Sequence, residues 1–124
     1  FALASGATFI ARCNARNINH TTAILKKAID HKGFSFVEII QDCLIFNPDA
    51  NNKDKLMYEV EDNKELEKAF ELAREFDYNS KDGKIPVGIL YQNKKTKTFA
   101  QKWPQIAKQI EGSPFYKKQI KKAS

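Results

Sequence analysis

The chain has 124 residues, of which 42% are hydrophobic and 29% charged, and its formal net charge is +6. This length allows one domain at most, and the composition is that of an ordinary folded chain, which excludes a disordered segment. No apolar run approaches the roughly 20 residues that cross a bilayer, and no signal peptide precedes the first strand-like segment. The chain starts at Phe1 without an initiator Met, and its first residues resemble the end of a helix. The sequence therefore predicts a piece of a longer protein.

The first part of the chain predicts a strand, a helix and a second strand. Residues 8–13 are rich in aromatic and β-branched residues and form the first strand. Asn19 is the expected N-cap of the helix, which ends before Gly33. Residues 34–40 are almost continuously apolar, which is typical of a parallel strand covered on both faces. These elements predict a βαβ unit with a right-handed crossover. The apolar stripe of its helix consists of Ile24, Leu25, Ala28 and Ile29.

Two further helices and a third strand are expected downstream. Asp62 and Glu65 have the spacing of a capping box for a helix at residues 63–76. Its apolar stripe consists of Leu66, Ala69, Phe70, Ala73 and Phe76, with Leu72 at the edge. Residues 85–91 form the third strand, and a weaker helix lies around residues 99–110. The expected fold class is α/β: part of a doubly wound, mostly parallel sheet, built from the βαβ unit plus further helices and a third strand.

Charge is distributed unevenly along the chain. Residues 1–83 carry eleven Lys or Arg and fourteen Asp or Glu, whereas residues 84–124 carry ten Lys and a single acid, Glu111. A basic end of this kind can bind an acidic partner or nucleic acid, or can simply be a solvated terminus. The segment has no Arg and few aromatic residues, which nucleic-acid sites use for base recognition and stacking. An acidic protein partner or plain solvation is therefore favoured over nucleic acid.

Cys13 and Cys43 are the two cysteines of the chain. They are too few for a disulfide scaffold or a zinc site, which indicates a reducing, cytoplasmic setting. Each stands near the carboxyl end of a predicted strand, where α/β sheets bind ligands. A thiol there can be a core residue, a ligand of an iron–sulfur cluster or one half of a redox pair. No glycine-rich phosphate loop, nucleophile elbow or His-rich motif is present, so we assign no catalytic and no cofactor-binding residue.

Several segments agree in order and spacing with one known family. They are residues 2–12, 24–43, 46–47, Tyr78 and residues 85–91. Together they resemble the beta subunit of 2-oxoacid:ferredoxin oxidoreductases, within the second half of its thiamine-diphosphate-binding domain. The resemblance assigns residues 1–110 to the C-terminal part of that α/β domain and residues 111–124 to a basic C-terminal tail.

This resemblance implies a component of a multi-subunit oxidoreductase. Such enzymes decarboxylate a 2-oxoacid oxidatively, form an acyl-CoA and pass electrons to ferredoxin or flavodoxin. The implied partners are the other subunits, the electron acceptor, coenzyme A and the 2-oxoacid, and no membrane is involved. Thiamine diphosphate and Mg²⁺ are implied to bind the N-terminal half of the subunit, which lies outside these residues. The 124 residues alone are therefore predicted to be inactive.

Two details of the resemblance concern particular residues. Cys43 matches the last cysteine ligand of a 4Fe–4S cluster, whereas Cys13 matches no ligand. Within the family, the amino-acid sequence of residues 34–38 resembles that of the members that act on 2-oxoglutarate more than that of the members that act on pyruvate. Residues 12–17 stand where relatives usually have a glycine-containing loop, so the contacts of that loop do not carry over.

Three alternatives stay open at this point. The first is a pyruvate-specific member of the same family. The second is a small basic module that binds an acidic partner or nucleic acid through its lysine-rich end. The third is a free-standing βαβ protein with a disulfide between Cys13 and Cys43.

Overall fold

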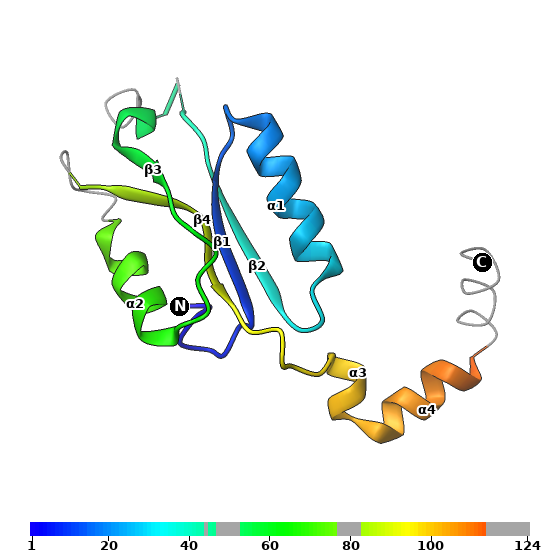
Figure 1. The fold of residues 1–124 in the computed structure, drawn as a ribbon. Helices are drawn as coiled ribbons and strands as arrows, with labels where there is room; N and C mark the ends of the chain where they lie inside the picture. Colours follow the sequence, from blue (N-terminus) through cyan, green and yellow to red (C-terminus); the bar gives the residue numbers. More distant parts are fainter. Residues whose placement is uncertain (44, 47–52, 77–82, 114–124) are drawn as a thin grey trace.

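A computed structural model describes residues 1–43, 45–46, 53–76 and 83–113 of the chain (Figure 1). In these residues, one sheet lies between two longer helices, and two shorter helices follow it. The strands are β1 (Phe9–Asn14), β2 (Ser35–Ile40), β3 (Met57–Glu59) and β4 (Ile85–Gln92). The helices are α1 (Ile18–Asp30), α2 (Leu66–Glu75), α3 (Phe99–Lys102) and α4 (Pro104–Gly112), with the 3₁₀ helix η2 (Lys53–Leu56) before β3.

The strand order in the sheet is β2-β1-β4-β3. β1 and β2 run parallel from the pair Phe9 and Ser35 to the pair Asn14 and Ile40, as the βαβ prediction requires. β4 is antiparallel to β1, and β3 is parallel to β4. The sheet is therefore mixed but mostly parallel, which confirms the α/β class. The short strand β3 was not predicted, because three residues are too few to show a periodic pattern.

Helix α1 covers one face of the sheet. Its buried residues Ile24 and Ala28 pack against Phe9, Ala11 and Cys13 of β1. The other two members of the predicted stripe point outward, with Leu25 37% and Ile29 82% exposed. The helix also begins earlier than predicted. Its N-cap is Asn17, whose side-chain oxygen accepts a hydrogen bond from the backbone N–H of His20 at 3.1 Å, so the assignment to Asn19 was wrong.

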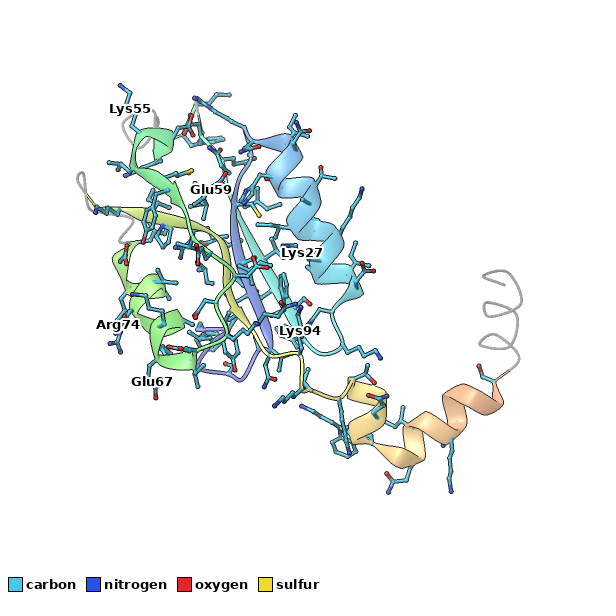
Figure 2. All side chains as sticks on the ribbon, viewed as in Figure 1. Lys27, Lys55, Glu59, Glu67, Arg74 and Lys94 are labelled. Carbon is cyan, nitrogen blue, oxygen red and sulfur yellow. The ribbon has the colours of Figure 1, made fainter. Side chains whose placement is uncertain are left out.

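Helix α2 covers the opposite face, where alternate residues of β1 and β4 pack against it. Its buried residues are Ala69 and Leu72, so Leu72 lies at the centre of the contact and not at its edge. The outward side of the helix carries charged residues such as Glu67 and Arg74 (Figure 2). This division of apolar and charged residues confirms the predicted amphipathic helix.

The predicted capping box of α2 does not form. Glu65 is the N-cap but makes no side-chain capping bond, and Asp62 instead pairs with Lys27 of α1 at 3.1 Å. Asn63 takes over the local role: its Oδ1 accepts from the N–H of Glu65 at 3.0 Å, and its Nδ2 donates to the carbonyl of Leu90 at 2.9 Å. The start of the helix is therefore anchored to β4, a contact that no local pattern could indicate.

Strand β2 is an edge strand within the described residues. The apolar run at residues 34–40 predicted cover on both faces, but Phe36 and Ile39 are each 44% exposed. Side chains alternate between the two faces along a strand, so Phe36 and Ile39, three residues apart, lie on opposite faces. Both faces of β2 are therefore partly exposed. The prediction that both faces of β2 are covered was wrong for this part of the structure. An apolar run shows which side chains are apolar, but it does not show which elements cover them.

The segment after β4 extends away from the sheet and contains α3 and α4 (Figure 1). A single weak helix was predicted here; the structure has two short ones, the second beginning at Pro104, a position in the first turn that suits proline. In the part of the chain that the structure describes, no helix combines the length and apolar character needed to cross a membrane.

Candidate functional site

The candidate site lies at the edge of the sheet where the parallel strands β1 and β2 end. β4 runs antiparallel to β1, so β4 and its parallel neighbour β3 begin at this same edge. Three connections therefore converge here: residues 15–17 after β1, residues 41–43 after β2, and η2 before β3. In open α/β sheets, the carboxyl ends of parallel strands are where ligands bind.

Cys43 lies three residues beyond the end of β2, at the predicted edge of the sheet. Its side chain is half-buried, and its Sγ accepts a hydrogen bond from the backbone N–H of Phe46 at 3.4 Å. Amide hydrogen bonds to cysteine sulfur are one of the features by which proteins tune iron–sulfur clusters. The placement of Cys43 thus agrees with the sequence, and its role as a ligand stays a prediction.

Cys13 has a different environment. It is completely buried within β1, in the cluster that α1 covers. Burial raises the pKa of its thiol, and a hydrogen bond with Thr21 acts in the opposite direction. A buried thiol with a raised pKa is a weak nucleophile, so Cys13 serves packing. Cys13 and Cys43, both among the described residues, are not joined to each other by a disulfide.

Arg16 is the centre of a polar network at the candidate site. Its Nη1 donates to Oδ2 of Asp54 in η2 at 2.7 Å, and its Nη2 donates to Oδ2 of Asp42 beside Cys43. Asn14 supports the same carboxylate, since its Nδ2 donates to Oδ1 of Asp54 at 3.0 Å. The guanidinium group therefore joins all three connections that converge at this edge.

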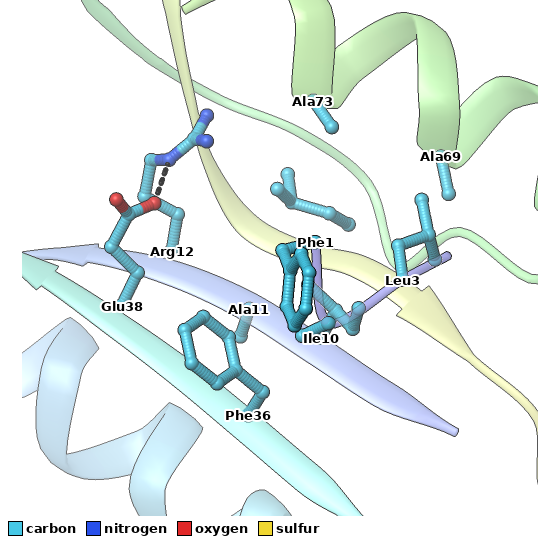
Figure 3. Close-up of a pocket in the computed structure, with 11 residues that line it drawn as sticks. Phe1, Leu3, Ile10, Ala11, Arg12, Phe36, Glu38, Ala69 and Ala73 are labelled. Carbon is cyan, nitrogen blue, oxygen red and sulfur yellow. Dashed lines mark hydrogen bonds and ion pairs between the residues drawn. The ribbon is translucent and has the colours of Figure 1, made fainter. Parts of the chain in front are cut away.

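Arg12 lies four residues earlier and is buried inside the sheet. Its Nε donates to Oε2 of Glu38 on β2 at 2.6 Å, and its Nη1 donates to the carbonyl of Pro86 on β4 at 3.4 Å. Its guanidinium carbon lies 4.8 Å from the ring centroid of Phe76. Arg12 and Glu38 line a pocket of about 270 Å³. Figure 3 shows this pair beside the other lining residues. Phe36 lines the same pocket.

The Arg12–Glu38 pair was missed in the sequence, although a signal was present. Glu38 interrupts an otherwise apolar strand, and a carboxylate that is partly removed from water favours a charged partner. Arg12 stands directly opposite Glu38 in the parallel register of β1 and β2. Pairing the two required the register of the strands, which local patterns do not provide.

Residues 1–43, 45–46, 53–76 and 83–113 contain no group of three His, Cys, Asp or Glu side chains placed to hold a metal ion. Any cluster held by Cys43 would therefore need further ligands from outside this part of the chain. Asn47 and Tyr78, which contribute to the family resemblance, lie outside the described residues. The lysines at 117–122, which dominate the basic tail, also lie outside them.

A family model for the C-terminal part of the pyruvate ferredoxin oxidoreductase beta subunit matches residues 50–108. The chain is 31% identical to the 2-oxoacid:ferredoxin oxidoreductase subunit beta of Saccharolobus solfataricus, over 82% of this chain and 37% of that protein. It is 46% identical to the 2-oxoglutarate oxidoreductase subunit KorB of Mycobacterium tuberculosis over 46 residues, which are 37% of this chain and 12% of that one.

A solved structure also matches the fold. It is described as 2-oxoglutarate:ferredoxin oxidoreductase from Magnetococcus marinus with 2-oxoglutarate, coenzyme A and succinyl-CoA bound. The similarity has a TM-score of 0.73 at 29% sequence identity and covers 98% of this chain and 41% of that one.

The mostly parallel sheet, with helices on both faces, places the chain in the α/β class, and its fold matches that of the solved structure. More specifically, the chain belongs to the family of 2-oxoacid:ferredoxin oxidoreductase beta subunits. It spans 37% of the length of the Saccharolobus relative and 41% of the solved chain.

Proposed function

We propose that this chain forms part of the beta subunit of a 2-oxoglutarate:ferredoxin oxidoreductase. In the proposed reaction, the 2-oxoacid and coenzyme A give an acyl-CoA, carbon dioxide, a proton and an electron pair. The electrons leave through an iron–sulfur cluster to ferredoxin or flavodoxin, which with the other subunits are the proposed partners. Residues 1–110 would belong to the thiamine-diphosphate-binding domain, and residues 111–124 would form its basic tail.

The observation that carries this proposal is the fold similarity along nearly the whole chain. The matched structure is named for 2-oxoglutarate and holds coenzyme A and succinyl-CoA. The KorB relative, whose name also contains 2-oxoglutarate, has the highest identity quoted above. These names support 2-oxoglutarate over pyruvate as the substrate of the proposed enzyme.

Cys43 is the residue proposed to contact a cofactor. It lies at the carboxyl edge of the sheet, its thiol is half-buried, and its Sγ already accepts one amide hydrogen bond. These features suit one thiolate ligand of a 4Fe–4S cluster, whose remaining ligands must come from elsewhere. A bound cluster would supply electron transfer; Cys43 would hold it, and the Phe46 amide would lower the charge on the sulfur.

Thiamine diphosphate with Mg²⁺ requires a different set of ligands, namely oxygen ligands for the metal. The two carboxylates nearest to the candidate site, Asp42 and Asp54, are both engaged by Arg16. The described residues therefore do not fit this cofactor, and we assign its binding to other parts of the subunit. We expect no turnover from the 124 residues alone.

The ligand assignment is tested by the substitution Cys43→Ser in the assembled enzyme. We expect less cluster iron per protein, a weaker signal of the reduced cluster in electron paramagnetic resonance, and slower reduction of the acceptor. Cys13→Ser is the matched control, because Cys13 is buried in the core and should leave the iron content unchanged. Full iron content and full electron transfer in the Cys43→Ser enzyme would contradict the assignment.

A further inference from the structure

The network around Arg16 has no part in the function proposed above. It contains one cation and two carboxylates, which come from connections far apart in the sequence. The Arg16 side chain is 55% exposed, whereas that of Asp42 is only 12% exposed and that of Asp54 33%. The carboxylate nearest to Cys43 is therefore the most deeply covered member of the network.

The conformation of Arg16 is fixed from both ends. At the backbone, its N–H donates to Oδ1 of Asn14 at 2.9 Å. At the guanidinium group, two different nitrogens contact two different carboxylates. Asn14 also contacts Asp54, so Arg16, Asp54 and Asn14 form a closed set of contacts, to which Asp42 is attached through Arg16. The planar guanidinium group has several N–H donors in fixed directions, so it can hold two carboxylates in a defined relative position. The ammonium group of lysine is a point charge and fixes their relative position less well.

The segment that Arg16 holds is the one that carries Cys43. β2 ends at Ile40, and residues 41–43 belong to no helix or strand. The carbonyl of Ile40 accepts a hydrogen bond from the N–H of Ala15 at 2.9 Å, which extends the pairing of β2 with β1 by one residue. Beyond it, the contact between Arg16 and Asp42 ties the segment to the loop after β1, one residue before the thiol.

We propose that Arg16 is a positioning residue for Cys43. It holds Asp42, and through it the segment that carries the thiol, against the ends of β1 and β3. The cluster-related part of this role rests on the proposed function of Cys43, whereas the positional part does not. Exposed ion pairs contribute little to global stability, so the expected effect is local.

The test measures the reactivity of the Cys43 thiol in the protein after removal of iron with a chelator. The rate of alkylation by iodoacetamide is followed by peptide mass spectrometry, with the buried Cys13 as the internal reference. We expect Arg16→Ala to raise the rate at Cys43 about threefold or more while the rate at Cys13 does not change, because the expected effect is local. Arg16→Lys should give an intermediate rate, because an ammonium group replaces only part of the contacts of the guanidinium group.

Three further variants sharpen the test. Asp42→Ala should reproduce the effect of Arg16→Ala, whereas Asp54→Ala leaves the contact between Arg16 and Asp42 in place and should have a smaller effect. Lys27→Ala removes a cation whose side chain is 53% exposed, close to the 55% of Arg16, from an ion pair with Asp62, and should leave the rate unchanged. An unchanged rate in Arg16→Ala, or an equal increase in Lys27→Ala, would overturn the proposal.

The iron-loaded enzyme separates this proposal from the function on which it partly rests. If Cys43 is a ligand, Arg16→Ala should also speed the loss of iron to a chelator. If Cys43→Ser keeps its full iron content, the ligand role fails, but the alkylation rates still decide whether Arg16 positions the thiol. If Cys43→Ser loses iron and the alkylation rates do not differ, the ligand role stands and the positioning role fails.

Discussion

Arg12 and Arg16 lie four residues apart, yet they illustrate two different uses of the same side chain. Arg12 is 6% exposed and joins three elements of the sheet interior. Arg16 is 55% exposed at its side chain and joins three connections at the carboxyl edge. The guanidinium group of Arg12 packs inside the sheet, so its removal loses buried contacts as well as an ion pair, whereas the guanidinium group of Arg16 lies mostly in solvent. The interior arginine should therefore determine stability, and the edge arginine local position.

The largest expected effect on the free energy of unfolding is that of Arg12→Met, compared with Arg16→Met. Methionine keeps much of the apolar part of the arginine side chain. Arg12→Met should lower the free energy of unfolding by about 2–3 kcal/mol, below the usual cost of breaking a buried pair because Glu38 is 38% exposed. Arg16→Met should cost less than about 1 kcal/mol. Urea denaturation of both variants checks the difference. Equal losses would contradict the division into interior and edge.

A double variant shows whether the loss at Arg12 arises from the unpaired carboxylate. Arg12→Met combined with Glu38→Leu should be more stable than Arg12→Met alone, because no half-buried, unpaired carboxylate is left behind. If the double variant is less stable than the single one, packing of the guanidinium against Phe76 accounts for the loss instead.

A second, smaller effect on the free energy of unfolding is expected at Gly88, a position in the sheet interior that requires glycine. Gly88 on β4 has φ +125°, and a Cβ there would stand 2.9 Å from the carbonyl oxygen of Val60. Gly88→Ala should lower the free energy of unfolding by about 1–3 kcal/mol, measured by urea denaturation. Gly112→Ala is the control, because a Cβ there meets no atom within 4 Å, and its effect should stay within about 0.5 kcal/mol. Similar values for both would show that β4 tolerates a side chain at Gly88.

The smallest effect is a pH dependence on the exposed side of β3. Burial, followed by the hydrogen bond of 2.6 Å to Glu75 of α2, raises the pKa of Tyr58 from 10.0 to about 12. The folded state thus holds this proton more tightly than the unfolded state does, so the contribution is complete below pH 10 and is lost as the pH rises to about 12. Because Tyr58 is 36% exposed, we expect less than about 1 kcal/mol.

Comparison with Tyr58→Phe isolates this contribution. The free energy of unfolding of both proteins is measured at several pH values across this range, and their difference should shrink as the pH rises. The difference cancels the titration of Cys13, whose raised pKa also lowers stability at alkaline pH. A constant difference between the two proteins would show that the fold does not raise the pKa of Tyr58.

Local patterns in the sequence were sufficient for the elements of the core. The βαβ unit, helix α2 and strand β4 were all predicted, because apolar spacing reports which side of an element is buried. The placement of Cys43 at the carboxyl edge followed directly from that prediction. The helix starts were less well predicted: the sequence indicated Asn19 as the N-cap of α1, whereas the structure has Asn17 in that position.

What the sequence alone determined is the α/β class, the family resemblance and the position of Cys43 after a parallel strand. The tertiary structure decided which charged residues work together. Glu38 pairs with Arg12 because the strand register places the two residues opposite each other. Asp42 and Asp54 both contact Arg16, although they lie 26 and 38 residues from it in the chain. Such contacts depend on how the strands are ordered and joined, and a short-range pattern of residue types contains no information about that order.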